Sequence, residues 1–331
     1  MKVIDLFAGC GGLALGFEKA GFEHVLLLDN DKSACATLKH NRPLWNVIQD
    51  SITNLDLEQG SADVLCAGLP CQPFSFAGKK LGLQDERGSI FFEFVRVLNQ
   101  LKPKIFVIEN VKGILFQDNG KTFDLIKKTL EESGYNISYQ VLDAKYYNVP
   151  QARQRLFIIG TAMDLPSFNW EGMTKHEIIP LKEVLQNVPD SPGFNYSEYK
   201  KFIFDLVPEG GWWKDLPINI MKEYMGNAYY QEGGKTGIAR RLSMDKPCYT
   251  LTCNPMRKQT ELCHPLETRP LSTREYARIQ TFPDDYEFIG STSSIYRQIG
   301  NAVPVNLAHF VADQVRLFSK YLSIIEVKSR L

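Results

Sequence analysis

The chain has 331 residues, no formal net charge and 44% hydrophobic residues, so it can bury one large core or two ordinary ones. Its seven cysteines are odd in number and scattered, which argues against a disulfide-stapled secreted fold, and its longest apolar runs are too short for membrane helices. The opening MKVIDLF lacks the apolar stretch of a signal peptide. We therefore expect a cytoplasmic protein with no membrane contact.

In the first half of the chain, short apolar runs alternate with helical patterns. Strands are predicted at residues 2–9, 24–31, 62–70, 103–111 and 155–161. Helices are predicted at residues 11–22, 89–101 and 122–134. The alternation predicts an α/β fold, a doubly wound and mostly parallel sheet with helices on both faces.

After residue 165 this pattern stops. The chain is rich in Trp, Tyr, Pro and Gly and is too long to be a loop of a compact domain, so a second, smaller and irregular domain is expected at residues 166–291. The catalytic, cofactor-binding domain would comprise residues 1–165 and 292–331. Its last helix is predicted from the apolar residues Leu307, Val311, Val315, Phe318 and Leu322, spaced by three or four.

A glycine-rich loop follows the first predicted strand. Ligands of α/β sheets bind beyond the carboxyl ends of the strands, where Gly9 and Gly11 let the backbone approach a ligand. Asp29 ends the second strand and can accept from two ribose hydroxyls. Because this pattern also fits the dinucleotide fingerprint, it leaves NAD and S-adenosylmethionine (AdoMet) both open.

The ordered motifs of the whole chain carry more information. They are DLFAGCGG, GLPCQPFS, IENVKG, QARQR, RPLSTREYARIQTFPDDY and QIGNAVPV. Together they resemble the motifs of DNA cytosine-5 methyltransferases, specifically the bacterial modification enzymes of type II restriction systems. The resemblance covers residues 1 to 160 and 269 to 310 and implies a Rossmann-like methyltransferase fold that binds AdoMet. The intervening segment lies where that family keeps its target recognition domain.

The resemblance also implies which residues bind the cofactor, with both ends of the chain contributing. These residues are Phe7, Gly9, Gly11, Gly12, Leu13, Asp29, Asn30, Asp50, Pro70, Asn301, Ala302 and Val303.

Cysteine chemistry explains the stretch GLPCQPFSFAGKK. Prolines on both sides hold Cys71 rigidly, as a nucleophile with a fixed direction of attack requires. Cytosine C5 attacks a methyl sulfonium only after a nucleophile has added at C6, and Cys71 is assigned that role. The same family resemblance implies that Glu109 donates a proton to N3 of the ring and that Arg153 and Arg155 steady the base. Asn110 would organise the loops.

The neutral chain carries a locally basic stretch. Lys235, Arg240, Arg241, Lys246, Arg257, Lys258, Arg269, Arg274 and Arg278 outnumber Asp245, Glu261, Glu267 and Glu275 there, which predicts double-stranded DNA as the partner. The expected DNA-binding residues are Ser75, Lys79, Arg87, Arg240, Arg241, Thr250, Arg257, Lys258, Gln259 and Gln298. The target base would be rotated out of the duplex into the pocket. Cys248, Cys253, Cys263 and His264 match no usual zinc spacing, so no metal is expected.

Three alternatives differ from this prediction. Transfer-RNA cytosine methyltransferases share the Pro-Cys-Gln core, but their Cys-Phe-Thr signature is missing here. A nicotinamide-dependent dehydrogenase fits the glycine loop and leaves Cys71 and Glu109 unexplained. A catalytically inactive DNA-binding module is disfavoured because every expected catalytic residue is present. We expect a monomer without a stable protein partner and a recognition site of about four to five base pairs.

Overall fold

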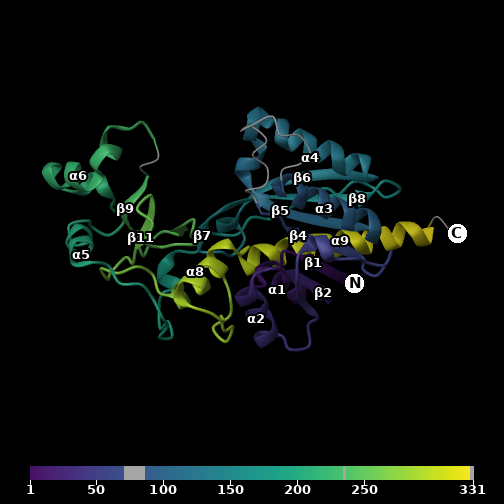
Figure 1. The fold of residues 1–331 in the computed structure, drawn as a ribbon, viewed down its shortest axis with the longest axis horizontal. Helices are drawn as coiled ribbons and strands as arrows, with labels where there is room; N and C mark the ends of the chain where they lie inside the picture. Colours follow the sequence, from purple (N-terminus) through teal and green to yellow (C-terminus); the bar gives the residue numbers. More distant parts are fainter. Residues whose placement is uncertain (71–85, 234–235, 329–331) are drawn as a thin grey trace.

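The computed structural model describes residues 1–70, 86–233 and 236–328. Figure 1 shows two lobes of unequal size joined by a narrower middle. The larger lobe is built on one sheet, in which the described residues form seven strands in the order β3-β2-β1-β4-β5-β8-β6. They are β3 (Val47–Gln49), β2 (Glu23–Asp29), β1 (Lys2–Leu6), β4 (Val64–Gly68), β5 (Ile105–Val111), β8 (Gln154–Ala162) and β6 (Tyr135–Asp143).

The sheet is parallel from β3 to β5, and β8 runs antiparallel to both of its neighbours, β5 and β6. The predicted α/β class and each of the five predicted strands are confirmed. Strands β3 and β6 were not predicted. Strand β6 was missed partly because it is an edge strand. Several of its residues are exposed or half-exposed, so it lacks the continuous apolar run of a central parallel strand.

Helices cover both faces of the sheet. The larger lobe contains α1 (Gly12–Lys19), α2 (Lys32–Asn41), α3 (Glu86–Leu101), α4 (Lys121–Glu132) and α9 (Val305–Lys328). One face of β1 packs with α3 and α4, and the other packs with α1 and α9. The two ends of the chain thus meet, because Leu307, Val311 and Val315 of α9 share a core with Phe17 of α1. The predicted final helix is confirmed. No helix among the described residues has the length and apolar character needed to cross a membrane.

The smaller lobe has short elements and its own core. It contains α5 (Glu198–Asp205), α6 (Ile218–Met225), β9 (Gly237–Arg241), β10 (Cys248–Tyr249) and β11 (Thr260–Cys263). Tyr196, Phe204, Trp213 and Ile238 pack together in its interior. Strand β10 leaves this lobe to pair with β7 (Gln151–Ala152), which directly precedes the two predicted catalytic arginines. The smaller lobe is thereby joined to the segment that leads into β8.

The chain returns to the larger lobe through α7 (Thr273–Ile279) and α8 (Thr292–Asn301). Before α8 begins, Tyr286 Oη donates to the carbonyl of Cys10 and the Ile289 N–H donates to Thr37 Oγ1. Residues 286–289 therefore contact the larger lobe. The predicted domain limits stay predictions.

Short 3-10 turns connect the main elements. They span Ile52–Asn54, Lys112–Leu115, Gln117–Gly120, Ala144–Tyr146, Leu181–Glu183, Trp213–Asp215 and Gly226–Tyr230.

Candidate active site and DNA-facing cleft

The loop after β1 has an unusual backbone. Phe7, Gly9 and Gly11 have φ values of 60°, 54° and 90°, in the left-handed region that costs a non-glycine residue about 1–2 kcal/mol. The Gly9 N–H donates to Asp29 Oδ2 at 2.7 Å, and the Asp31 N–H donates to Asp29 Oδ1 at 2.8 Å. Asp29 therefore fixes the turn at the ends of β1 and β2, and its carboxylate orients the same loop that the sequence assigns to the cofactor.

The start of α1 lies against the segment that follows α8. A Cβ on Gly12 would be 2.2 Å from the carbonyl oxygen of Val303 and 3.1 Å from the Cβ of Ala302, so only glycine fits this contact. The first-turn N–H groups of a helix have no intrahelical partners and carry a partial positive charge. The structure thus brings together predicted cofactor residues that are almost 300 positions apart in the sequence.

The other predicted cofactor residues occupy varied environments. Asn30, Pro70 and Asn301 are exposed, whereas Leu13 is buried in the core beneath the loop. Asp50 is exposed just after β3, where its carboxylate accepts from the Ser51 N–H and from Asn54 Nδ2. The Asn54 hydrogen bond lowers the pKa of Asp50. Burial raises the pKa of Asp29, and its backbone hydrogen bonds oppose that rise. The assignment of all these residues to cofactor binding stays a prediction.

Asp5 was not singled out from the sequence. It lies in β1 beside Cys66 of β4 and is 1% exposed, and neither carboxyl oxygen has a hydrogen-bond partner among the described residues. Burial, reinforced by nearby Asp29, raises the pKa of Asp5 to about 8. A carboxylate in the middle of an apolar strand run is the signal that could have identified it.

Glu109 and Arg155 form the centre of the candidate active site. Glu109 lies near the end of β5, opposite Gly68 of β4, and Arg155 is the second residue of β8 on the other side. Arg155 Nε lies 2.8 Å from Glu109 Oε1, and the two side chains are 11% and 10% exposed. Burial raises the pKa of Glu109, although Arg155 and Arg153 act in the opposite direction. A carboxyl in this environment holds a proton at higher pH than a solvated one.

Asn110 supports the neighbouring loop. Its Nδ2 donates to the carbonyl of Leu69 at 3.2 Å, and its Oδ1 accepts from the Val111 N–H at 2.8 Å. These bonds join Asn110 to the segment just after β4, and its loop-organising role stays a prediction. Cys71, Ser75, Lys79 and Lys235 lie outside the described residues, and of Arg87 only the backbone, within α3, is described.

Arg153 occupies a different environment from Arg155. It is 1% exposed, and its guanidinium donates to the carbonyls of Leu251, Gly300 and Ala302. These bonds join the smaller lobe to the end of α8. The hydrogen bonds described for Arg153 are thus with backbone carbonyls, and the expectation that both arginines steady the base stays a prediction.

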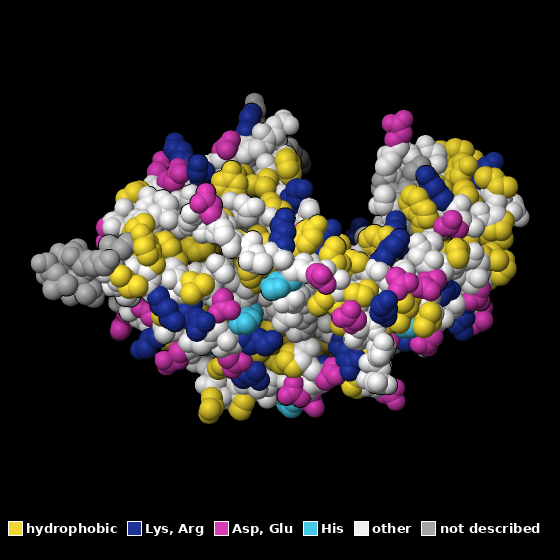
Figure 2. Space-filling view, turned by 180° about the vertical axis from the view of Figure 1, so that it is seen from behind, with side chains coloured by type: hydrophobic (Ala, Val, Ile, Leu, Met, Phe, Trp, Pro, Cys, Tyr) yellow, Lys and Arg dark blue, Asp and Glu magenta, His cyan; other side chains and the backbone are white. Residues whose placement is uncertain are grey.

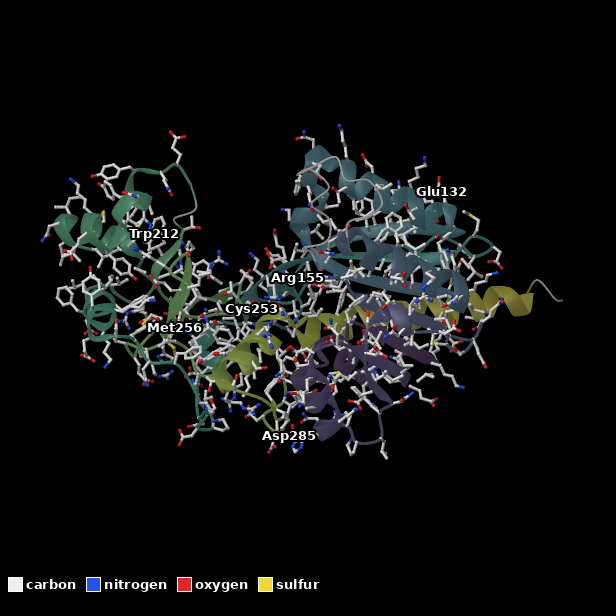
Figure 3. All side chains as sticks on the ribbon, viewed as in Figure 1. Glu132, Arg155, Trp212, Cys253, Met256 and Asp285 are labelled. Carbon is white, nitrogen blue, oxygen red and sulfur yellow. The ribbon has the colours of Figure 1, made fainter. Side chains whose placement is uncertain are left out.

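The space between the lobes is an open cleft with Lys and Arg side chains along its walls, as Figure 2 shows from behind. Arg155 and Cys253 lie at its base (Figure 3). The Cys253 thiol donates to Asn301 Oδ1 at 2.8 Å. Among the predicted DNA-binding residues, Thr250, Arg257, Lys258 and Gln259 are exposed in the segment around Cys253, and Arg240 is partly exposed. Thr250 also donates to the carbonyl of Ala152.

Two predicted DNA-binding residues are buried. Arg241 is 7% exposed, and its guanidinium donates to Thr268 Oγ1 and to the carbonyls of Phe204, Val207, His264 and Glu267. Gln298 is 5% exposed, accepts from Thr37 Oγ1 and donates to the carbonyl of Ile289. The polar atoms of both residues are directed inward and have internal partners, and the prediction that these residues contact DNA stays a prediction.

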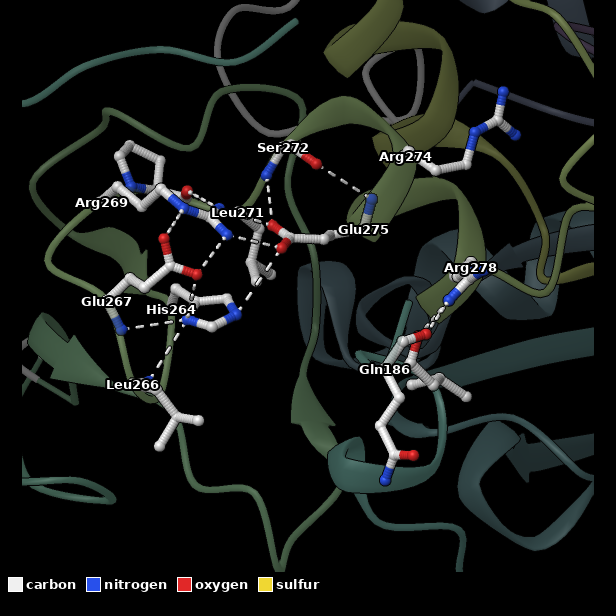
Figure 4. A network of polar contacts seen from close by, with 12 residues as sticks. Gln186, His264, Leu266, Glu267, Arg269, Leu271, Ser272, Arg274, Glu275 and Arg278 are labelled. Atoms are coloured by element: carbon white, nitrogen blue, oxygen red, sulfur yellow. Dashed lines mark hydrogen bonds and ion pairs between the residues drawn. The ribbon is translucent and has the colours of Figure 1, made fainter. Parts of the chain in front are cut away.

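Other members of the basic stretch also have internal partners. Arg269 is ion-paired with Glu267 and Glu275, in a network in which His264 Nδ1 accepts two backbone N–H groups (Figure 4). Arg278 pairs with Asp284, and Arg274 donates to backbone carbonyls. The predicted positive footprint is therefore smaller than the residue count suggested.

Comparison with known proteins identifies the family. The chain matches the model of the C-5 cytosine-specific DNA methylase family over residues 1–316. It is 55% identical over 319 residues to the type II methyltransferase M.PspPI of Psychrobacter sp. (strain TA137), covering 93% of this chain and 77% of the relative. M.Eco47II, a type II methyltransferase of Escherichia coli, is 49% identical over 326 residues, covering 95% and 78%.

A solved structure of a DNA modification methyltransferase has a similar fold. A proposed DNA modification methyltransferase encoded within an E. coli prophage is 25% identical, with a TM-score of 0.72 and coverage of 97% of this chain and 99% of that one. The family model spans nearly the whole chain. The glycine loop, the Glu109–Arg155 pair and the returning terminal helix thus belong to a member of the C-5 cytosine-specific DNA methylase family.

Proposed function

We propose that this enzyme flips one cytosine out of a short, specific site in duplex DNA and methylates it at C5, protecting host DNA from a restriction endonuclease. The observation that carries the proposal is the Glu109–Arg155 pair at 2.8 Å. Glu109 lies opposite the last residue of β4, and the chain runs from there through Leu69 and Pro70 to Cys71. The proposed proton donor thus lies near the end of β5, and the proposed nucleophile follows the adjacent parallel strand β4 by three residues in the sequence. The type II relatives support a bacterial, cytoplasmic setting.

Enzymes of this family use AdoMet as the methyl donor, and the residues present fit it. The turn held by Asp29 is open beside Gly9, where an added Cβ would meet no atom within 4 Å. The start of α1, packed on residues 302–303, offers N–H groups suited to a carboxylate. Bound there, AdoMet supplies an electrophilic methyl group on its sulfonium. Asp5, whose carboxyl oxygens have no hydrogen-bond partner in the described part of the chain, adds a buried polar group in β1, the strand that leads into this turn.

The proposed chemistry begins with Cys71. Its thiolate adds to C6 of the flipped cytosine while Glu109 gives a proton to N3, so that C5 becomes nucleophilic. Arg155, which is ion-paired with Glu109, keeps the Glu109 carboxyl aligned with the cytosine ring. After C5 has gained the methyl group, a base removes the C5 proton, and the electron pair of that bond expels Cys71 as thiolate. The aromatic ring is restored and Glu109 recovers its proton from N3.

Covalent trapping tests this mechanism. A duplex with 5-fluorocytosine at the target position is expected to form a stable adduct in the presence of AdoMet, because fluorine cannot leave C5 as a proton does. Mass spectrometry should locate the adduct on the peptide that contains Cys71. Cys71→Ser should form almost none, since a hydroxyl is much less ionised than a thiol near neutral pH.

Cys253 provides the matched control because it is an exposed thiol at the base of the cleft. Cys253→Ser should still be trapped. Attachment at Cys253, or undiminished methylation by Cys71→Ser, would overturn the mechanism. Methylome sequencing of a plasmid from cells expressing the wild-type protein would give the modified base and its site, and resistance of that plasmid to a matching endonuclease would test the protective role.

A further inference from the structure

Arg240 contacts two aromatic rings in the smaller lobe. Its guanidinium carbon is 4.2 Å from the ring centroid of Tyr249 and 5.2 Å from that of Trp212. Trp212 is itself fixed by its backbone N–H, which donates to Asp215 Oδ2 at 2.8 Å. Tyr249 is 44% exposed. Cation–π contacts with both rings restrict the movement of the guanidinium at a site open to solvent.

The hydrogen bonds of Arg240 occupy only one edge of that plane. Nε and Nη2 both donate to the carbonyl of Thr236. Within the described part of the chain, no acceptor contacts Nη1. The outer edge, formed by Nη1 and the second hydrogen of Nη2, thus remains available as a two-pronged donor.

The backbone just before Arg240 is strained, and this strain affects the orientation of the Arg240 side chain. Ala239 has a φ of 43°, and β9 has an irregular register with β11 at this point. The Ala239 N–H donates to Glu261 Oε1 at 2.9 Å, which holds the distortion. Bulges of this kind re-aim a side chain and are frequent next to functional sites. As a result, Arg240 remains partly exposed while the next residue, Arg241, is buried.

The stack also lies next to the catalytic machinery. Tyr249 pairs with Ala152 between β10 and β7, and Arg155, the partner of Glu109, is three residues further along the chain. Figure 3 places Trp212 in the smaller lobe and Arg155 at the base of the cleft beside it. A duplex held with its target cytosine near Glu109 would therefore present neighbouring base pairs to Arg240.

We propose that Arg240 is a specificity-determining residue that reads one guanine of the recognition site through its major-groove edge, an inference that rests on the proposed function. The free fork of the guanidinium matches the adjacent O6 and N7 acceptors of guanine. Adenine would place an amino group against those donors, so the restrained guanidinium also rejects the wrong purine. A phosphate contact requires no such restraint, since a phosphate offers acceptors in several directions.

The test uses the recognition site found by methylome sequencing of the wild-type protein. Fluorescent duplexes with that site, and variants in which each guanine in turn is replaced by 7-deazaguanine, are titrated with protein in the presence of S-adenosylhomocysteine. One replacement should weaken wild-type binding by about tenfold, because it removes the N7 acceptor. Arg240→Ala should weaken binding of the natural site by about 10- to 100-fold and should be insensitive to that same replacement.

Variants of the stack give a second measurement. Tyr249→Ala should lose most of the discrimination at that guanine, and Tyr249→Phe, which keeps the ring, should retain most of it. Lys222→Ala is the matched control, because it removes an exposed charge from α6 and leaves the stack intact. It should change binding of all duplexes by the same small factor.

Equal losses by Arg240→Ala on the natural site and on unrelated duplex DNA, with a reduced salt dependence, would make Arg240 a phosphate contact and overturn the proposal. The proposal would also be overturned if every 7-deazaguanine replacement weakened DNA binding by Arg240→Ala as much as it weakens binding by the wild type. It would likewise be overturned if no replacement weakened DNA binding by the wild-type protein, a result that needs no variant. Failure of the proposed function is distinguishable, because the wild-type protein would then methylate no cytosine in DNA.

Discussion

The catalytic edge of the sheet and the smaller lobe position their charged side chains in different ways. At the sheet edge, Glu109 and Asp29 are placed by strand register, so each lies at a predictable distance from the end of its strand. In the smaller lobe, Arg240 and Arg241 are adjacent in sequence, yet one is partly exposed in contact with aromatic rings and the other is buried among carbonyls. Strand register therefore predicts where charged side chains lie at the sheet edge. In the smaller lobe, side-chain packing determines whether a charged side chain is exposed or buried.

The largest effect is expected from Glu109→Gln. Removing the proton donor should lower kcat by about 10²- to 10⁴-fold and leave AdoMet affinity unchanged. Glu93→Gln is a suitable control, because Glu93 forms an ion pair with Arg96 on α3, away from the active site. Single-turnover methylation of a cognate duplex measures the effect.

The pH profile sharpens this prediction. Because burial raises the pKa of Glu109, wild-type kcat should persist to higher pH than with a solvated carboxyl and should fall as the pH passes that pKa. Arg155 lowers the pKa of Glu109, so Arg155→Gln should move the basic limb of the residual activity to higher pH. A profile unchanged by both Glu109→Gln and Arg155→Gln would show that register at the sheet edge does not place the acid.

Asp5 gives the largest expected effect on folding. The carboxyl keeps its proton up to about pH 8 in the folded chain and loses it near its ordinary value of 3.8 when unfolded, so stability falls as the pH rises between these values. Between pH 5 and pH 8 the wild-type free energy of unfolding should drop by about 3–4 kcal/mol from this group. Asp5→Asn should abolish that drop, as measured by urea denaturation.

The exposed Asp124 on α4 supplies the comparison for Asp5. Asp124→Asn should keep the wild-type pH dependence of stability. An identical pH dependence in Asp5→Asn and the wild type would mean that the Asp5 carboxyl is ionised in the folded protein at neutral pH.

In the smaller lobe, Arg241 is expected to act on stability. Arg241→Met should lower the free energy of unfolding by about 2–4 kcal/mol, because it leaves buried carbonyls without donors. Arg257→Met, at an exposed position, should change stability by less than about 0.5 kcal/mol and weaken DNA binding instead. Measuring the free energy of unfolding and the DNA affinity of both variants would distinguish the two effects. Equal effects of the two variants on stability would remove the distinction between buried and exposed arginines.

The smallest effects concern the cofactor loop. Asp29→Ala should weaken AdoMet binding by about 1–3 kcal/mol, since it removes the acceptor for the Gly9 N–H and the expected ribose contact together. Asp50→Ala, at an exposed position, should cost less. Calorimetry with S-adenosylhomocysteine measures both losses, and a larger loss for Asp50→Ala would reverse the order inferred from burial.

The sequence by itself determined the α/β class, the five central strands, the final helix and the family. These features follow from short-range patterns, because apolar runs define parallel strands and the motifs lie where those strands end. Glu109 was predictable for this reason, as was the loop from Phe7 to Leu13. Asn110 was predicted to organise loops, and its hydrogen bond to Leu69 agrees with that prediction.

Only the tertiary structure decided which polar side chains face inward. Arg153 binds carbonyls 98 to 149 positions away, and Gln298 meets Thr37 from a distance of 261 positions. No local pattern encodes such contacts, because an arginine that caps distant carbonyls and one that faces DNA have the same residue type and similar neighbours in the sequence. The cost of burying a polar group without a partner selects the inward orientation, and this cost depends on the carbonyls that the completed fold brings to the site.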